Sequence, residues 1–200
     1  WDGPVNESDD PYPTGTWTGS VPGLPVQKHI QEVRILLGKS SPTDNDAIKQ
    51  ALTDYGAVFA SYYHANSFYS TANYAYNYSG TNAGNHAVAI VGWNDNFDRT
   101  HFPVAAPSNG AYIVKNSWGT GWGDAGYFYV SYYDTKFAHE DMFVFLNAEP
   151  VGNYRKCYQY DPLGWFNSFR QPWAAAIYTA STSEPLQAVG FYSAQAASYE

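Results

Sequence analysis

The sequence predicts an α+β fold, in which an antiparallel sheet or half-barrel with one main helix precedes a shorter all-β unit of the sandwich type. Three observations predict it. A single segment near the start has the apolar spacing of an amphipathic helix. Almost every later segment has the short apolar or alternating pattern of a strand. Residues 150–200 are also strand-like, but a complete β-sandwich needs about 100 residues, so this unit is expected to be cut off at Glu200.

The first elements follow from composition and spacing. Residues 1–25 hold many Pro, Gly, Asp and Thr residues, which indicates an extended, turn-rich segment. Residues 29–37 alternate in polarity and predict a strand. A helix is predicted between Pro42 and Gly56, because acidic residues such as Asp46 suit its positive end and a glycine can end it in a left-handed conformation. Its apolar stripe consists of Ala47, Ile48, Ala51, Leu52 and Tyr55.

The rest of the chain is predicted to be strand. The strands expected after the helix are 57–63, 86–92, 111–116, 126–133 and 142–146, followed by 154–160, 173–179 and 187–193. A turn-like stretch at 149–153 separates the two groups, so the predicted domains are 1–149 and 150–200. Because Trp1 is an implausible natural start, we expect further sequence upstream of it.

Composition excludes several functions. The net charge of −8 makes a nucleic-acid partner unexpected, because phosphate binding needs clustered Lys and Arg. No apolar run is long enough to cross a membrane. A sequence rich in Tyr, Asn, Ser and Thr and poor in Lys favours an extracellular or cell-surface location.

Two candidate reactive groups favour ordinary structural roles. Cys157 is the only cysteine, so the chain can form no internal disulfide. It lies in a strand-like segment, and we expect it to be structural and partly buried rather than reactive. The run from Asn94 to Asp98 alternates oxygen-bearing side chains, but it lacks the Gly and Glu of a calcium loop and is expected to be a solvated turn. No metal or other cofactor is predicted.

Two motifs carry the chemistry. The first, Asn-His-Ala-Val-Ala-Ile-Val-Gly-Trp, places His86 at the start of strand 86–92. The second, Lys-Asn-Ser-Trp-Gly-Thr-Gly-Trp-Gly, places Asn116 at the end of strand 111–116. The connection between the strands has no clear helix, which favours antiparallel pairing and brings both side chains to one edge of the sheet. A general base and its orienting partner need this arrangement.

Trp118 and Trp122 follow Asn116 at once, interleaved with glycines that allow a tight turn. Indole rings over a hydrogen bond between His86 and Asn116 would exclude water and strengthen it. Each residue taken singly is compatible with an ordinary turn or a core histidine. Their order and spacing together favour a catalytic site.

Residues 84–134 resemble the second half of the papain-like cysteine peptidases, which carry His, then Asn-Ser-Trp-Gly, then a Gly-Tyr-containing strand. The resemblance implies that His86 is the general base, Asn116 its orienting residue and Trp118 its shield. More weakly, it implies that Ala60 or Ser61 borders a substrate subsite. Residues 150–200 resemble the start of a lectin-like β-sandwich, which prokaryotic and archaeal cell-surface members of the family often carry.

The chain departs from the family in one respect that bears on activity. Members place the nucleophilic cysteine about 130 residues before the histidine, whereas only 85 residues precede His86 and none is Cys. The resemblance therefore implies that the nucleophile and the oxyanion-stabilising glutamine lie upstream of Trp1. The chain alone is expected to be inactive.

Three functions remain open. The first is a cysteine endopeptidase, of which this chain is one part, with a peptide or protein substrate and the missing cysteine-bearing half as partners. The second is a peptidase-shaped scaffold without catalysis that binds carbohydrate or protein at the cell surface. The third is transamidation on the same Cys–His framework. Trp165, Phe166 and Trp173 could stack on a sugar, although such residues more often close a small core.

Overall fold

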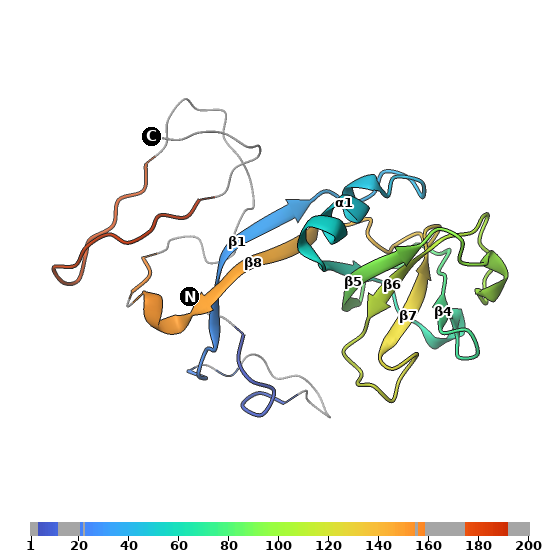
Figure 1. The fold of residues 1–200 in the computed structure, drawn as a ribbon, viewed down its shortest axis with the longest axis horizontal. Coiled ribbons are helices and arrows are strands. Elements are labelled where there is room, and N and C mark those ends of the chain that lie inside the picture. The colour runs from blue at the N-terminus through green and yellow to red at the C-terminus, as the bar shows by residue number, and fades with distance from the viewer. Residues whose placement is uncertain (1–3, 12–20, 22, 155, 159–174, 192–200) are drawn as a thin grey trace. The chain divides into compact units, whose positions relative to one another are not determined.

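The structure is a computed structural model that describes residues 4–11, 21, 23–154, 156–158 and 175–191. Residues 32–146 form one compact unit, and the described residues on either side of it belong to a second. The larger unit contains the helix, most of the sheet and both sequence motifs (Figure 1).

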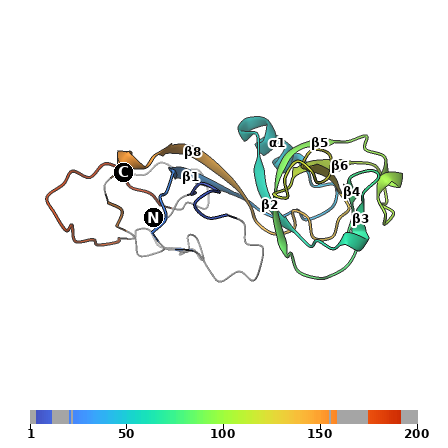
Figure 2. The same cartoon turned by 90° about the horizontal axis from the view of Figure 1, so that it is seen from below.

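The sheet has eight strands in the order β1-β8-β2-β5-β6-β7-β4-β3. From β8 to β3 the pairings are antiparallel except that β4 lies parallel to β7. Figure 2 shows the strands from β2 to β3 curving round a common centre, as in a half-barrel. The strands are β1 (Lys28–Leu36), β2 (Val58–Tyr62), β3 (Tyr69–Ser70), β4 (Ala75–Tyr76), β5 (His86–Asn94), β6 (Ala111–Lys115), β7 (Tyr127–Ser131) and β8 (Met142–Pro150). One helix with a mostly antiparallel sheet confirms the predicted fold class.

The helix, α1 (Asp46–Tyr55), forms where the sequence predicts it. Ile48, Ala51 and Leu52 on its apolar stripe are buried. Gly56 ends it with a φ of 87°, and its backbone N–H donates to the carbonyl of Leu52 at 2.9 Å. This backbone conformation favours glycine, because in other residues the Cβ atom would crowd the neighbouring backbone.

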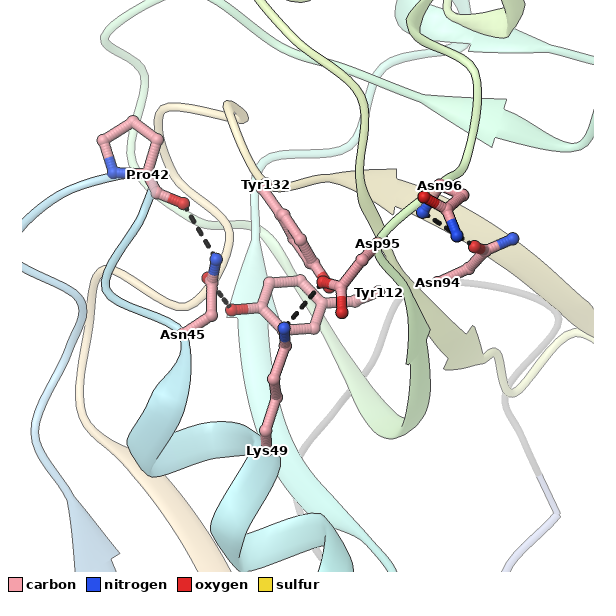
Figure 3. Close-up of polar contacts among 8 residues, drawn as sticks. All are labelled: Pro42, Asn45, Lys49, Asn94, Asp95, Asn96, Tyr112 and Tyr132. Atoms are coloured by element: carbon pink, nitrogen blue, oxygen red, sulfur yellow. Dashed lines mark hydrogen bonds and ion pairs between the residues drawn. The ribbon is translucent and has the colours of Figure 1, made fainter.

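Side chains at the start of α1 attach the helix to the loop after β5 (Figure 3). The ammonium of Lys49 lies 2.6 Å from Oδ1 of Asp95, and the hydroxyl of Tyr132 donates to the same oxygen at 2.8 Å. Asn45 accepts a hydrogen bond from the hydroxyl of Tyr112 instead of capping the helix with its own side chain. The carboxylate of Asp95 therefore binds the protein's own donors, as suits a structural turn.

The core of the larger unit is unusually aromatic. Alternation along β2 sends Val58, Ala60 and Tyr62 inward, while Phe59 between them keeps 37% of its surface exposed. Five tyrosines are buried in the described part of the chain, where each hydroxyl needs a partner. The largest fully buried side chains are Tyr62, Tyr76, Tyr112, Phe128 and Phe137.

The structure corrects several expectations about the strands. β3 and β4 have two residues each and were not expected, because so short a segment has no detectable period. β8 continues to Pro150 instead of ending at residue 146. Short 3-10 helices at Asn66–Phe68, Arg99–His101 and Val151–Asn153 complete the elements.

The predictions for the last part of the chain are wrong where the structure describes it. Residues 154, 156–158, 175–179 and 187–191 form no strand, although strands were expected there. Cys157 is exposed rather than partly buried. The aromatic residues considered for sugar stacking, Trp165, Phe166 and Trp173, lie outside the described residues.

Two kinds of feature are absent from the described residues. No helix among them has the length and apolar character needed to cross a membrane. In the same residues, no group of three or more His, Cys, Asp or Glu side chains is arranged to hold a metal ion.

Candidate active site

His86 and Asn116 meet at one edge of the sheet. β5 and β6 are antiparallel, as predicted, with Ala89 opposite Lys115, so the start of β5 lies beside the end of β6. Nε2 of His86 lies 2.8 Å from Oδ1 of Asn116. Because an amide oxygen can only accept, Nε2 carries the proton and donates it. The expected meeting of these two side chains is confirmed, whereas their catalytic roles stay a prediction.

The amide of Asn116 is held in this orientation. Its side chain is buried, and Oδ1 also accepts the backbone N–H of Ser117 at 2.8 Å. The backbone N–H of Asn116 donates to the carbonyl of Gly126 at 2.9 Å. Two donors converge on the same oxygen, so the oxygen rather than the NH₂ group faces His86.

The ring of His86 is half-buried, and its second nitrogen, Nδ1, has no hydrogen-bond partner among the described residues. An imidazole with one nitrogen fixed and the other available can take a proton from a group that approaches the available side.

Trp118 covers this pair. Its indole stacks on the imidazole of His86 with ring centroids 4.7 Å apart and planes at 23°. Trp122 packs edge-on against Trp118 at 4.9 Å and stacks on Tyr69 at 4.8 Å. A layer of aromatic rings therefore shields the hydrogen bond from water on that side.

The glycines of the second motif make the turn that returns both indoles to the site. Gly119, Gly123 and Gly126 have φ values of 78°, 61° and 93°. A Cβ on Gly123 would lie 2.4 Å from the carbonyl oxygen of Tyr127, which no real contact allows. Only glycine fits here without moving the backbone.

The two weaker subsite candidates differ in accessibility. Ala60 has no exposed surface and belongs to the core. Ser61 is half-exposed, pairs with Ala87 across the sheet, and donates a hydrogen bond to Oε2 of Glu140 at 2.7 Å. Of the two, only Ser61 offers surface that a substrate could touch.

Sequence reasoning missed His64, which lies in neither of the two motifs. Its ring packs edge-on against Trp118 at 4.8 Å, and its centroid lies 6.2 Å from that of His86. The pairing of β2 with β5 could have indicated that His64 lies near the site. Tyr62 at the end of β2 lies opposite His86 at the start of β5, so the residues just after β2 must reach the site.

Comparison with known proteins shows the family of this chain. Residues 2–145 match the family described as papain family cysteine protease, and residues 157–200 match a lectin-like domain. The chain therefore belongs to the papain family of cysteine proteases, and a lectin-like domain follows the protease-like part.

Similar proteins cover only parts of the chain. Cathepsin B-like CP1 of Giardia intestinalis is 39% identical over 62 residues, which are 31% of this chain and 18% of that protein. Cathepsin B-like cysteine proteinase 3 of Caenorhabditis elegans is 36% identical over 84 residues, which are 40% of this chain and 20% of that protein.

Among solved structures, the cysteine protease and lectin-like domains of Cwp84, a surface layer associated protein of Clostridium difficile, are 32% identical with a TM-score of 0.62. That match covers 75% of this chain and 34% of the Cwp84 chain. The chain thus spans about a third of the Cwp84 structure and a fifth or less of these curated relatives.

Proposed function

We propose that this chain supplies the base half of a Cys–His–Asn site that hydrolyses peptide bonds. His86 is the general base, Asn116 orients it, and the thiol comes from sequence upstream of Trp1. The observation that carries this proposal is the 2.8 Å hydrogen bond between His86 and the fixed amide oxygen of Asn116, covered by Trp118.

The geometry suits an ion pair between a thiolate and an imidazolium. Nδ1 of His86 takes the thiol proton, while Nε2–H stays hydrogen-bonded to Asn116. A neutral amide fixes the ring without adding a negative charge, so His86 can take the thiol proton and still release one to the leaving amine. An aspartate would hold the proton more tightly and slow its release.

In the proposed reaction the thiolate sulfur attacks the peptide carbonyl carbon. The C–N bond breaks, His86 donates its proton to the leaving amine, and an acyl-thioenzyme remains. Water then attacks the acyl carbon, gives a proton to His86, and releases the acid and the thiol. Substrate side chains would lie along Ser61 and Ala87, which are paired across β2 and β5 and share one face of the sheet, one residue before Tyr62 and one after His86.

The chain by itself is expected to be inactive, because it has no cysteine before His86. The family's spacing places that cysteine about 45 residues before Trp1. Any help from the upstream glutamine in stabilising the oxyanion would come from the same missing part.

We further propose an extracellular or cell-surface location, with the lectin-like part as a carbohydrate- or protein-binding module. Two observations support it: the polar, lysine-poor composition and the similarity to Cwp84, which is described as surface layer associated. The match of residues 157–200 to a lectin-like domain supports the binding role.

The test labels the intact protein with an epoxide reagent that alkylates activated thiols. His86→Ala should abolish labelling while circular dichroism shows an unchanged fold, and His101→Ala, in the loop between β5 and β6, should label as the wild type does. Labelling that persists in His86→Ala would overturn the proposal.

Two further measurements address the other functions. An upstream sequence with Ser, Ala or Gly in place of the cysteine would establish a binding scaffold without catalysis. Products formed with an added amine acceptor would reveal transamidation, whereas hydrolysis yields free acids only.

A further inference from the structure

We propose that His64 is a positioning residue of the site: in its neutral form it holds Trp118 over the hydrogen bond between His86 and Asn116. The inference rests on the proposed function, and it adds a second imidazole that the established family chemistry does not require.

His64 and His86 contact the same indole from different directions. The plane of His86 is nearly parallel to that of Trp118, at 23°, whereas the plane of His64 is nearly perpendicular to it, at 81°. The two centroid distances are 4.7 and 4.8 Å. Stacking alone would let the indole slide across the imidazole, and an edge-on ring beside it restricts that movement.

The backbone of His64 is fixed relative to the catalytic strand. Asn85, the residue before His86, accepts the backbone N–H of His64 through Oδ1 at 2.7 Å. The same side chain donates through Nδ2 to the carbonyl of His64 at 3.1 Å. This pair of hydrogen bonds ties the end of β2 to the start of β5, so His64 and His86 keep a constant separation.

The ring of His64 is fixed as well. Nε2 lies 3.2 Å from Oδ1 of Asn66, and Nδ1 lies 2.9 Å from the hydroxyl of Tyr62. An amide oxygen accepts, so Nε2 carries the proton and Nδ1 accepts from the tyrosine. The ring also stacks on Tyr76 with centroids 5.6 Å apart. A neutral imidazole satisfies every one of these contacts.

Electrostatics favours the same form. Burial lowers the pKa of His64; the hydrogen bond to Asn66 raises it in part, the neighbouring His86 lowers it again, and the net direction is down. The other titratable groups that face the ring are the hydroxyls of Tyr62 and Tyr76, whose pKa values are raised mainly by burial, so both stay neutral. A proton on His64 would place a like charge next to the imidazolium that the ion pair needs, and would destabilise it.

The test compares His64→Ala with His64→Phe in the intact protein, and uses His101→Ala as the matched control. Phenylalanine keeps an aromatic edge against Trp118 but cannot take a proton, whereas alanine removes both. We expect His64→Ala to lower kcat about tenfold or more with KM nearly unchanged, because small misplacements are costly at such sites. His64→Phe should keep kcat within about threefold of the wild type at neutral pH, since a conserved edge keeps the indole in position.

The pH profile separates positioning from simple stability. As the pH falls, kcat should be lost at a lower pH in His64→Phe than in the wild type, because phenylalanine cannot take the proton that would cost His64 its hydrogen bond from Tyr62. The inference is overturned if His64→Ala keeps the kcat of His101→Ala, if phenylalanine is as slow as alanine, or if only the melting temperature changes.

Failure of the proposed function would look different. If His86→Ala still labels, the site itself is misassigned. If His86→Ala loses labelling but both His64 variants behave as the wild type, the site stands and only the role of His64 is refuted.

Discussion

Replacing Asn116 with alanine tests the central hydrogen bond directly. Asn116 is 6% exposed, and its Oδ1 lies 2.8 Å from Nε2 of His86. A hydrogen bond to a charged group contributes about 1.5 to 3 kcal/mol. Because each 1.36 kcal/mol corresponds to about a tenfold change in rate, we expect kcat/KM to fall by about 10- to 150-fold.

The pH dependence of Asn116→Ala tests whether the hydrogen bond stabilises the charged form of His86. Asn116 accepts from His86 whether or not the ring is charged, but the bond to the charged ring is stronger. Its loss should therefore move the alkaline limb of the activity profile to lower pH by about one unit. Asn116→Asp keeps an acceptor and adds a negative charge, so it should move the same limb to higher pH.

The assay is the pH profile of kcat/KM for a peptide substrate of the intact protein, with Asn73→Ala as control. Asn73 is likewise an asparagine with a side-chain hydrogen bond, which its Nδ2 donates to the backbone carbonyl of His101, but it makes no contact with His86 or Trp118. If Asn116→Ala keeps both the rate and the alkaline limb of Asn73→Ala, the hydrogen bond does not act on the reacting form of His86 and the reasoning fails.

The remaining predictions concern stability. Burial lowers the pKa of Lys39 to about 8. Between pH 8 and about 10.5 the unfolded chain still binds this proton and the folded chain does not. The free energy of unfolding of the wild type should therefore rise with pH, relative to that of Lys39→Met, by up to about 3 kcal/mol. Denaturant titrations at several pH values measure this difference, and a difference that does not change with pH would refute the prediction. Gly123→Ala should destabilise the turn that carries the indoles by about 1–3 kcal/mol and lower labelling of the thiol, because its Cβ would clash with the carbonyl of Tyr127 and its backbone is left-handed. Calorimetry measures the loss of stability. Gly121→Ala is the control, because a Cβ there meets nothing within 4 Å.

Local pattern was enough for the larger elements. α1 and β1, β2, β5, β6 and β7 form within two residues of their predicted bounds, because their periodicity reports which face is buried. The end of α1 was predictable from Gly56 alone, whose conformation depends on the residue type. β3 and β4 could not be predicted, because two residues have no period and their pairing depends on distant strands.

Some residues of the candidate site were predictable from the sequence and others were not. His86 and Asn116 were predictable because each lies at the end of a recognisable strand, and antiparallel pairing brings those ends together. His64 was not, because it follows the end of β2 with no motif of its own. Its contact with Trp118 depends on the turn through Gly119 and Gly123, which folds the indole back over the strands.

The amino-acid sequence by itself determined the order of the helix and the longer strands, the family and the pair of groups that can form a base, since these depend on residue type and on short-range spacing. The tertiary structure decided which side chains contact that pair and which surfaces stay accessible. It places His64 against Trp118, buries Ala60 in the core, and pairs the carboxylate in the loop after β5 with donors of the protein itself. The physical reason is that contacts between segments far apart in the chain depend on strand register and turn geometry together, and no single stretch of sequence contains both.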